Sequence, residues 1–251
     1  MNIKWNAKFY KDNFYFVPQY GEDVMNLITA KQGAVVIDLG CGNGTLTKKL
    51  SDMGYSVIGV DASKEMLDLA KKEYSNLEFR FGNAIDFNVS DKADVIFSNA
   101  VFHWIDEKDQ EKMVENICNQ LKTGGELVCE FGGYGCAESI HGTLEKSFLK
   151  RGMHYPRTFY FPTISQYSSI LEKHGFRVEF ATLFERPTIQ KTDEGLKNWI
   201  NMFVTIPFLG IDEVLKNEII HEAEVGLRDK LMVDGKWYVD YIRIRLRARK
   251  I

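Results

Sequence analysis

The sequence lacks an uncharged apolar run approaching the roughly 18 residues that a membrane-spanning helix requires. Its first twenty residues carry Lys and Asp among aromatics and form no continuous apolar core, so we expect no signal peptide. Its four cysteines have no metal-ligand spacing, which predicts no metal site and reduced thiols in a cytoplasmic protein. These cysteines are Cys41, Cys118, Cys129 and Cys136.

A surplus of basic residues is also missing. Lys and Arg total 32 against 35 Asp and Glu, a formal net charge of −3, so a dominant phosphate-backbone partner is not expected. The chain of 251 residues is 45% hydrophobic and 27% charged, which is typical of a globular protein with a full core. We therefore expect a small-molecule substrate, neither nucleic acid nor membrane as partner, and a monomer or homodimer.

The most informative segment present is a glycine-rich turn after a β-branched apolar run. The run Val35–Leu39 contains an acid, Asp38, and is followed by Gly40, Gly42 and Gly44. An amphipathic helical pattern begins at once and covers residues 45–53. Glycines let backbone approach a ligand closely, and the free amides at a helix N-terminus attract anionic groups. The order strand, turn, helix therefore predicts a nucleotide-like cofactor site.

Strand and helix patterns alternate from residue 35 to residue 133, which predicts a parallel sheet covered on both faces. Ser63 is the expected N-cap of the second of these helices. The five expected strands are Val35–Leu39, Ser56–Asp61, Leu77–Phe81, Asp94–Ser98 and Glu126–Phe131, with a helix over Lys108–Lys122 closed by Thr123-Gly124-Gly125.

The pattern changes after Gly133. Helices are expected over residues 137–152 and 165–174, and over 193–231 with a break at Ile206-Pro207. Strands are expected over Phe176–Leu183 and over Val239–Arg249, where apolar residues alternate with arginines. The predicted fold is α/β, a doubly wound, mostly parallel seven-stranded sheet with helical insertions that form a substrate cap.

Six segments follow from this interpretation. They are an N-terminal aromatic arm and first helix (1–34), a cofactor-binding core (35–133), a helical cap insertion (134–175), a strand and loop of the core (176–192), a second helical insertion (193–235) and a C-terminal core strand (236–251).

Two cofactors compete for the glycine turn, a nicotinamide dinucleotide and S-adenosylmethionine. The dinucleotide fingerprint G-x-G-x-x-G needs a glycine at position 45, where this chain has Thr45. The Asp38 carboxylate would repel a pyrophosphate but suits the ammonium group of a methionine moiety. Asp61 ends the second strand and can accept both ribose hydroxyls of either cofactor. Met66 could supply a polarizable floor for adenine.

These residues resemble a known family. The block 35–44, together with 57–63, Gly82-Asn83-Ala84 and 98–104, resembles the class I S-adenosylmethionine-dependent methyltransferases. Within that group the chain is most similar to the trans-aconitate-methyltransferase-like branch, through residues 130–133, 185–188 and Trp199…Phe203. The resemblance covers nearly the whole chain and is most specific for the cofactor.

The resemblance implies roles for individual positions. Gly40, Cys41 and Gly42 would contact the methionine portion, Asp38 its ammonium group and Asp61 the ribose. Asn83, Ala84 and Ile85 would meet the adenine edge, and Asn83 stands where family members usually carry Asp. The predicted cofactor site also contains Ala62, Met66, Asn99, Ala100, Trp104 and Tyr10.

The methyl acceptor is expected at residues that follow the fourth strand. Phe102 and His103 would lie toward it, and His103 is either a general base or a structural histidine. A carboxylate acceptor needs no base, whereas a hydroxyl or an amine does. Arg186 is either a carboxylate clamp or an ion-pair partner of Glu185. The other residues predicted to line the acceptor site are Tyr134, Tyr160, Phe161 and Trp199.

Two further features allow more than one interpretation. The aromatic N-terminal arm either covers the cofactor or packs on the domain; its members are Trp5, Phe9, Tyr10, Phe14, Tyr15, Phe16 and Tyr20. The arginines at 243, 245, 247 and 249 are expected to form ion pairs with acidic helices rather than an anion-binding patch.

The leading hypothesis is a methyltransferase that acts on a small molecule. The alternatives are a non-catalytic protein that binds S-adenosylmethionine and an NAD-dependent oxidoreductase. Nucleic-acid methylation is disfavoured because Asn99-Ala100-Val101-Phe102 lacks the two prolines expected where a flipped base is methylated.

Overall fold

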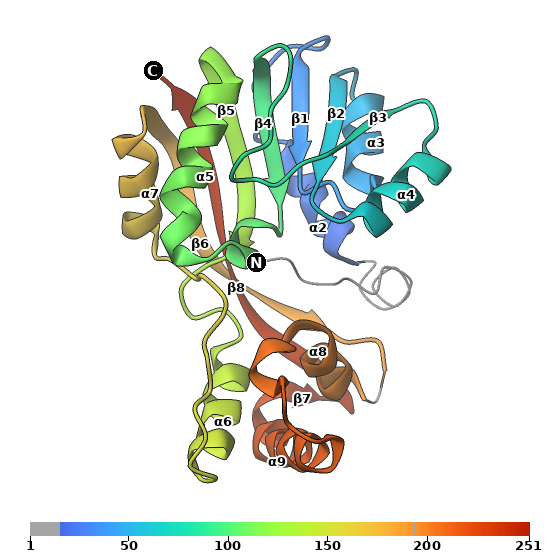
Figure 1. The fold of residues 1–251 in the computed structure, drawn as a ribbon, viewed down its shortest axis with the longest axis vertical. Coiled ribbons are helices and arrows are strands. Elements are labelled where there is room, and N and C mark those ends of the chain that lie inside the picture. The colour runs from blue at the N-terminus through green and yellow to red at the C-terminus, as the bar shows by residue number, and fades with distance from the viewer. Residues whose placement is uncertain (1–15, 193) are drawn as a thin grey trace. The chain divides into compact units, whose positions relative to one another are not determined.

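The computed structural model describes residues 16–192 and 194–251, and the side chains among them from residue 21 onward. These residues form two compact units (Figure 1). The first unit comprises residues up to 133, 160–183 and 244–251, and the second comprises residues 134–159 and 184–243. Within the described residues, no helix has the length and apolar content needed to cross a membrane.

A seven-stranded path of hydrogen-bonded strands organises the fold, in the order β3-β2-β1-β4-β5-β8-β6. Strands β1 to β5 are parallel neighbours along this path, whereas the arrow of β8 points the opposite way to that of β1 (Figure 1). The predicted doubly wound, mostly parallel α/β fold is therefore confirmed. The strands are β1 Val35–Leu39, β2 Ser56–Asp61, β3 Glu78–Phe81, β4 Ala93–Asn99, β5 Leu121–Gly132, β6 Phe176–Ile189 and β8 Lys236–Lys250, and a two-residue strand, β7 Met232–Val233, pairs with β8.

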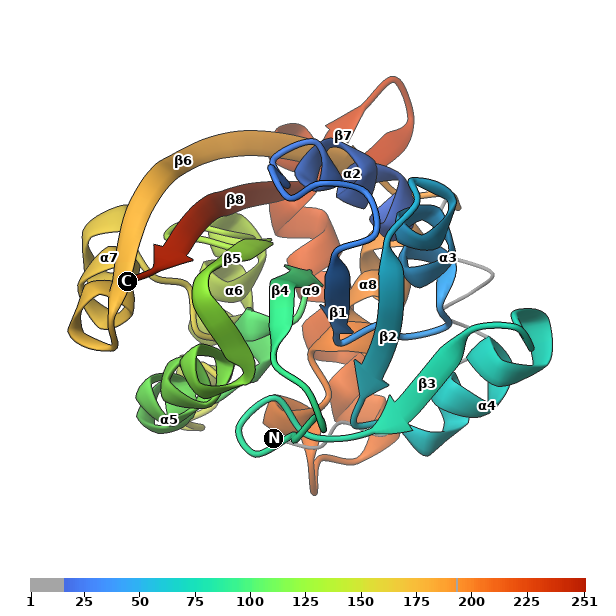
Figure 2. The same ribbon diagram turned by 90° about the horizontal axis from the view of Figure 1, so that it is seen from above.

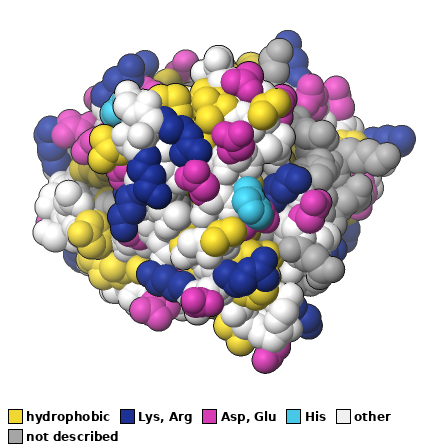
Figure 3. Space-filling view, turned by 90° about the horizontal axis from the view of Figure 1, so that it is seen from below, with side chains coloured by type: hydrophobic (Ala, Val, Ile, Leu, Met, Phe, Trp, Pro, Cys, Tyr) yellow, Lys and Arg dark blue, Asp and Glu magenta, His cyan; other side chains and the backbone are white. Residues whose placement is uncertain are grey.

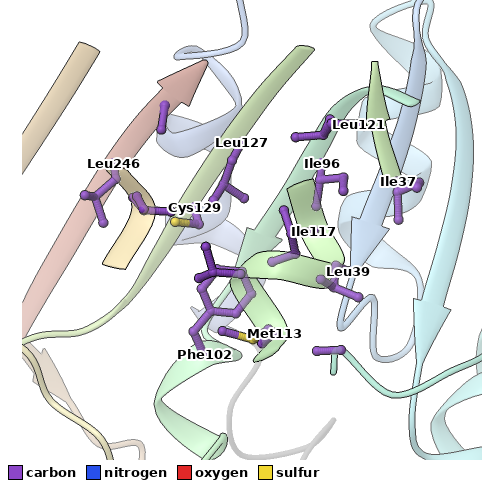
Figure 4. Packing of buried hydrophobic residues seen from close by; sticks show 14 of the residues in the cluster. Ile37, Leu39, Ile96, Phe102, Met113, Ile117, Leu121, Leu127, Cys129 and Leu246 are labelled. Atoms are coloured by element: carbon purple, nitrogen blue, oxygen red, sulfur yellow. The ribbon is translucent and has the colours of Figure 1, made fainter. Parts of the chain in front are cut away.

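Two sets of helices cover the two faces of the sheet in the first unit (Figure 2). Alternate residues of the strands point to opposite faces, so Ile37 and Val36 of β1 enter different apolar clusters. Helices α2 (Phe16–Met25) and α3 (Thr45–Asp52) pack on the Val36 face, and α5 (Glu107–Gln120) and α7 (Ile164–Lys173) pack on the Ile37 face. The labelled side chains of Figure 4 belong to the cluster on the Ile37 face, where Met113 and Ile117 of α5 pack against the strands.

The start of β5 differs from the prediction. The helix α5 ends at Gln120, and β5 begins at Leu121 and runs through the expected stop signal Thr123-Gly124-Gly125. Gly124 has a φ of +79°, and the register between β4 and β5 shifts at this point. The two glycines therefore form a bulge within the strand instead of a helix end.

Strands β6 and β8 are longer than predicted because each belongs to both units. Residues 176–183 and 244–250 lie in the first unit, and residues 184–189 and 236–243 lie in the second. The pattern predicted a stop for β6 at Leu183, before Glu185-Arg186-Pro187, yet Pro187 lies inside the strand.

The second unit contains α6 (Glu138–Leu149), α8 (Gly195–Phe203) and α9 (Glu213–Leu231), together with parts of β6 and β8. Helix α6 packs on α9, where Ser147 and Arg151 both donate hydrogen bonds to Glu222. The break expected at Ile206-Pro207 is present as a short 3-10 helix, Ile206–Phe208.

The expected single cap insertion 134–175 is divided between the two units. Residues 134–159 lie in the second unit, but residues 160–175 lie in the first. Tyr167 and Leu171 of α7 are fully buried in the main sheet cluster, and this burial assigns α7 to the core.

Candidate functional site

The candidate site lies where the order of the strands reverses. Strands β2 and β4 lie on opposite sides of β1. The chain moves outward from β1 to β2 and β3 in one direction, and then returns to β4 and continues to β5 in the other direction. The carboxyl end of β1 is therefore a topological switch point. Ligands in open α/β sheets bind outside the strand ends at such a point. The glycine turn 40–44 begins there, directly after β1.

The backbone of the glycine turn requires glycine at its first position. Gly40 has a φ of +78°, and a side chain there would overlap with the Val101 side chain that follows β4. The amides of Gly40 and Cys41 both donate to the Val60 carbonyl at the end of β2. The turn is therefore held between the ends of β2 and β4, and its three glycines leave the backbone without side chains at these positions.

The start of α3 is already partly capped from within the turn. The Asn43 Oδ1 atom accepts hydrogen bonds from the Thr45 amide at 3.3 Å and from the Thr45 hydroxyl at 2.9 Å. A pyrophosphate would need this helix N-terminus. The Asn43 side chain therefore already bonds one amide of this helix N-terminus.

Asp38 is a carboxyl group buried beneath the turn. It is 2% exposed and its Oδ2 accepts a 2.6 Å hydrogen bond from the Thr47 hydroxyl of α3. Burial raises the pKa of Asp38 to about 7; the nearby Asp61 charge adds to the rise, and the Thr47 bond opposes it. A buried carboxylate in this position is stabilised by a cationic group.

Asp61 connects the end of β2 to the turn. Its Oδ2 accepts from the Gly42 amide at 2.8 Å and its Oδ1 from the Ser63 amide at 2.7 Å. Burial raises the pKa of Asp61, while the backbone bonds from Ser63 and Gly42 lower it. Each carboxylate oxygen has a further lone pair, so ribose hydroxyls can still be accepted. The structure thus gives Asp61 a positioning role that the sequence did not indicate.

The predicted adenine floor lies against the same turn. The predicted N-cap Ser63 is confirmed, since its hydroxyl accepts from the Met66 amide at the start of α4 (Lys64–Glu73). The Met66 side chain is buried, and its Cε lies 3.3 Å from where a Cβ on Gly42 would be. Ala62, between Asp61 and Ser63 in the sequence, is exposed. Burial and the two acids raise the pKa of the Cys41 thiol well above its usual value, so Cys41 is an unreactive group.

The predicted adenine-edge residues follow β3. The Asn83 Oδ1 accepts from the Ile85 amide at 3.2 Å, and the Asn83 carbonyl accepts from the amides of Asp86 and Phe87. Ala84 is buried in the main cluster and Ile85 packs against it. One lone pair of the Asn83 side chain is therefore used inside the turn.

The segment after β4 meets the glycine turn through Val101. Asn99 is 9% exposed, and Ala100 has a φ of +61°, a left-handed conformation that is costly for a residue with a Cβ. Phe102, His103 and Trp104 form a 3-10 helix. The buried His103 ring lies 5.2 Å from the Trp104 ring and 6.0 Å from the Phe161 ring, and the Tyr160 amide donates to the His103 carbonyl.

The remaining predicted residues are distributed over the two units. Tyr160 and Phe161 belong to the first unit, whereas Tyr134, Arg186 and Trp199 belong to the second. Tyr134 is 63% exposed, Arg186 lies 5.0 Å from the Phe184 ring centre, and the Trp199 indole donates to the Tyr241 hydroxyl at 2.6 Å. Tyr10 and the aromatic residues 5–15 lie outside the described residues.

Arg245, Arg247 and Arg249 of β8 form ion pairs, as predicted, but with acidic residues on strands instead of helices. Arg245 pairs with Glu130 of β5 at 2.7 Å, and Arg249 pairs with Glu126 of β5 and Glu179 of β6. Side chains on one face of a sheet meet their cross-strand neighbours, which explains the choice of partners.

Three residues that shape the site were not predicted from the sequence. They are Thr47, which bonds Asp38; Val101, which fills the space above Gly40; and Gln110, whose amide donates to the carbonyls of Phe102 and Ile105. Thr47 and Gln110 each occupy a buried position on an amphipathic helix. A polar residue at such a position is a signal that could have identified them.

Comparisons with known proteins identify the family of the chain. Residues 36–125 match the family described as "Methyltransferase domain". The chain is 30% identical to an uncharacterised methyltransferase of Schizosaccharomyces pombe, with 98% of each chain covered. It shares 29% identity with a methyltransferase homologue of Invertebrate iridescent virus 6 over 59% of this chain and 54% of that one.

Solved structures show the same fold. A proposed methyltransferase from Bacillus halodurans superposes with a TM-score of 0.65 at 17% identity, covering 92% of this chain and 99% of that one. Phosphoethanolamine N-methyltransferase 2 of Haemonchus contortus, in complex with phosphomonomethylethanolamine and S-adenosylhomocysteine, superposes with a TM-score of 0.59 at 18% identity, covering 97% of this chain and 56% of that one. With its glycine turn, its acids at the ends of β1 and β2 and its full-length relative, the chain belongs to the class I S-adenosylmethionine-dependent methyltransferases.

Proposed function

We propose that this enzyme methylates a small-molecule acceptor, and that its cofactor lies at the glycine turn of the first unit. The observation that carries the proposal is the buried Asp38 carboxyl beneath a turn of bare backbone. A buried acid favours a bound cation and opposes a bound phosphate. The oxidoreductase alternative is set aside because the chain belongs to the methyltransferase family.

The residues of the turn fit S-adenosylmethionine. In this proposal Asp38 faces the ammonium group, the backbone of residues 40–42 faces the methionine chain, and Asp61 accepts the ribose hydroxyls. Met66 and residues 83–85 contact the adenine, and Asn99 and Ala100 lie near the sulfonium. The cofactor supplies a methyl group that is activated by positive sulfur, so the protein contributes alignment and exclusion of water.

A small acceptor is supported by the charge of the protein. On the face drawn in Figure 3, Lys and Arg side chains are interspersed with Asp and Glu, in keeping with the net charge of −3. Phosphomonomethylethanolamine, which is bound with S-adenosylhomocysteine in the Haemonchus complex, is itself a small molecule. We further propose that the chain belongs to the trans-aconitate-methyltransferase-like branch, supported by the resemblance of residues 130–133 and 185–188, and that Tyr160 of the first unit contacts the acceptor.

We also propose a cytoplasmic location. All four cysteines are free thiols, and three of them are buried. Free thiols of this kind are usual in reducing compartments.

Calorimetric titration with S-adenosylhomocysteine tests the cofactor site. We expect binding by the wild type and a loss of about tenfold or more for Asp61→Ala, because charge-assisted bonds to the ribose are worth about 1.5–3 kcal/mol each. The exposed Asp68→Ala on α4 is the matched control and should bind as the wild type does. Equal affinity of the two variants would contradict the ribose assignment. Binding of NADH without binding of S-adenosylhomocysteine would overturn the whole proposal.

A further inference from the structure

The turn that follows β3 is attached to the strand end that carries Asp61. The Gly82 amide donates to the Asp61 carbonyl at 3.0 Å, and the Asp61 carboxyl accepts from the Gly42 amide of the glycine turn. Asp61 also pairs with Phe81 in the register of β2 and β3. The turn 82–87 therefore continues directly from the edge of the candidate site.

Three carbonyls of this turn already accept hydrogen bonds from protein groups. The Asn83 carbonyl accepts from the amides of Asp86 and Phe87, at 3.1 and 2.7 Å. The Asn116 side chain of α5 donates to the carbonyls of Ala84 and Phe87, at 3.3 and 3.1 Å. These bonds hold the backbone of the turn in one conformation.

The Asn83 side chain is oriented by a backbone amide. Its Oδ1 atom accepts from the Ile85 N–H at 3.2 Å. A backbone N–H can only donate, so the oxygen of the side-chain amide, and not its nitrogen, must lie on this side. Turning the amide over would place two donors against each other and leave the Ile85 N–H without its acceptor. The Asn83 nitrogen therefore points away from Ile85.

The groups that this turn can still offer to a ligand are donors. Within residues 16–192 and 194–251, no group accepts from the Asn83 side-chain nitrogen or from the Ala84 amide, and Asn83 is half-buried. An aspartate at position 83 could bond Ile85 with one oxygen and accept from a ligand with the other. Asparagine has an N–H donor in place of that second oxygen, and the remaining lone pair of its Oδ1 lies on the Ile85 side.

We infer that Asn83 makes the cofactor site recognise the purine only as a hydrogen-bond acceptor, so that the 6-amino group of adenine is not read. This inference rests on the proposed function, in which residues 83–85 contact the adenine. The edge of adenine carries an acceptor, N1, beside a donor, the 6-amino group. The Asn83 nitrogen and the Ala84 amide can donate to N1, but neither can accept from the amino group. The site therefore takes S-nucleosyl cofactors whose purine lacks the 6-amino group as readily as S-adenosyl ones.

Calorimetric titration of the full chain with two ligands tests this specificity. The ligands are S-adenosylhomocysteine and the same compound with hydrogen in place of the 6-amino group, which keeps N1 as an acceptor. We expect the wild type to bind the two within about threefold, because no protein acceptor is lost with the amino group. Asn83→Asp keeps an oxygen for Ile85 and adds a charged acceptor, so it should prefer S-adenosylhomocysteine by about tenfold or more. A wild type that binds the deaminated ligand about tenfold more weakly would overturn the inference.

Asp86→Asn is the matched control, because it exchanges carboxylate for amide at an exposed position of the same turn. It should keep the wild-type ratio of the two affinities. If Asp86 reads the amino group instead, the wild type will prefer S-adenosylhomocysteine and Asp86→Asn will lose this preference, which also overturns the inference.

Nitrogen-15 NMR of the side-chain amides gives a second readout on the wild-type protein. The Asn83 signal is assigned by its absence from the spectrum of Asn83→Asp, and we expect the two ligands to shift it alike. An Asn83 signal that neither bound ligand moves would overturn the inference. A wild type that binds neither ligand would defeat the proposed function as well, whereas discrimination between the two ligands would defeat only the inference about Asn83.

Discussion

The Thr47 hydroxyl donates a 2.6 Å hydrogen bond to the Asp38 carboxyl, from α3 to β1 across the glycine turn. Both residues are buried, so this bond joins the helix to the strand inside the protein. It also opposes the effect of burial, which raises the pKa of Asp38 to about 7. The helix that follows the turn therefore lowers the pKa of an acid whose pKa burial raises.

Asp38→Asn should stabilise the ligand-free protein at pH 8. The folded-state pKa of about 7 lies above the ordinary aspartate value of 3.8, so the folded protein binds more protons than the unfolded chain between these values, and stability falls as the pH rises through this window. The cost at pH 8 is at most about 4 kcal/mol, because a pKa that differs by 1 between the folded and unfolded chain corresponds to about 1.36 kcal/mol. Urea unfolding at pH 5 and pH 8 measures the effect. A variant that is no more stable than the wild type at pH 8 would contradict it.

The affinity for S-adenosylhomocysteine should fall at acid pH. Asp38 must lose its proton to pair with an ammonium group, so we expect the dissociation constant to rise up to tenfold per pH unit below about 7 and to level off above it. Asp61 on β2 and Cys41 in the turn also face this region, and burial raises the pKa of both. Calorimetry between pH 5.5 and 8.5 measures the profile. Thr47→Val removes the opposing bond and should move the midpoint upward, whereas Thr47→Ser keeps the hydroxyl and should leave it in place. A flat wild-type profile would show that Asp38 does not meet the cation.

Gly40→Ala should cost more than Gly33→Ala, although both glycines have a positive φ. Gly40 has a φ of +78° and faces Val101, whereas Gly33 has a φ of +86° with nothing within 4 Å of its missing Cβ. The left-handed backbone alone costs an alanine about 1–2 kcal/mol, so the difference between the variants reports the contact with Val101. We expect Gly40→Ala to be more destabilised in thermal unfolding and to lose binding of S-adenosylhomocysteine. Equal unfolding temperatures of the two variants would show that the contact with Val101 does not destabilise Gly40→Ala.

Arg249→Ala should destabilise the first unit by about 3 kcal/mol, because it leaves the buried Glu126 carboxylate without its cation. Lys173→Ala, which breaks an exposed pair with Glu111, should destabilise the protein far less, because water screens this pair. Chemical unfolding of both variants checks this contrast. A double change, Arg249→Ala with Glu126→Gln, should recover part of the loss. No recovery would mean that the arginine acts through packing and not through charge.

Sequence patterns with a local physical cause predicted much of the fold. The strand periods, the Ser63 cap and the glycine turn depend on neighbouring residues, so they could be predicted without knowledge of the fold. Predictions of where an element ends were less accurate when the same residues could end a helix or continue into a strand. The glycines at 124–125 were expected to close a helix, but pairing with β4 makes them part of β5.

The sequence by itself placed the acid Asp38 directly before the glycine turn 40–44, and this order predicted the class of cofactor. It could do so because the backbone conformation of the turn and the sign of the charge depend on adjacent residues. Only the tertiary structure decided the pKa of that acid, through burial and Thr47, and the orientation of the His103 ring, whose Nδ1 accepts a hydrogen bond from the Gly132 amide 29 residues away. It also decided that α7 belongs to the core, through the burial of Tyr167. Burial and long-range hydrogen bonds depend on which distant segments meet, and no local pattern records this.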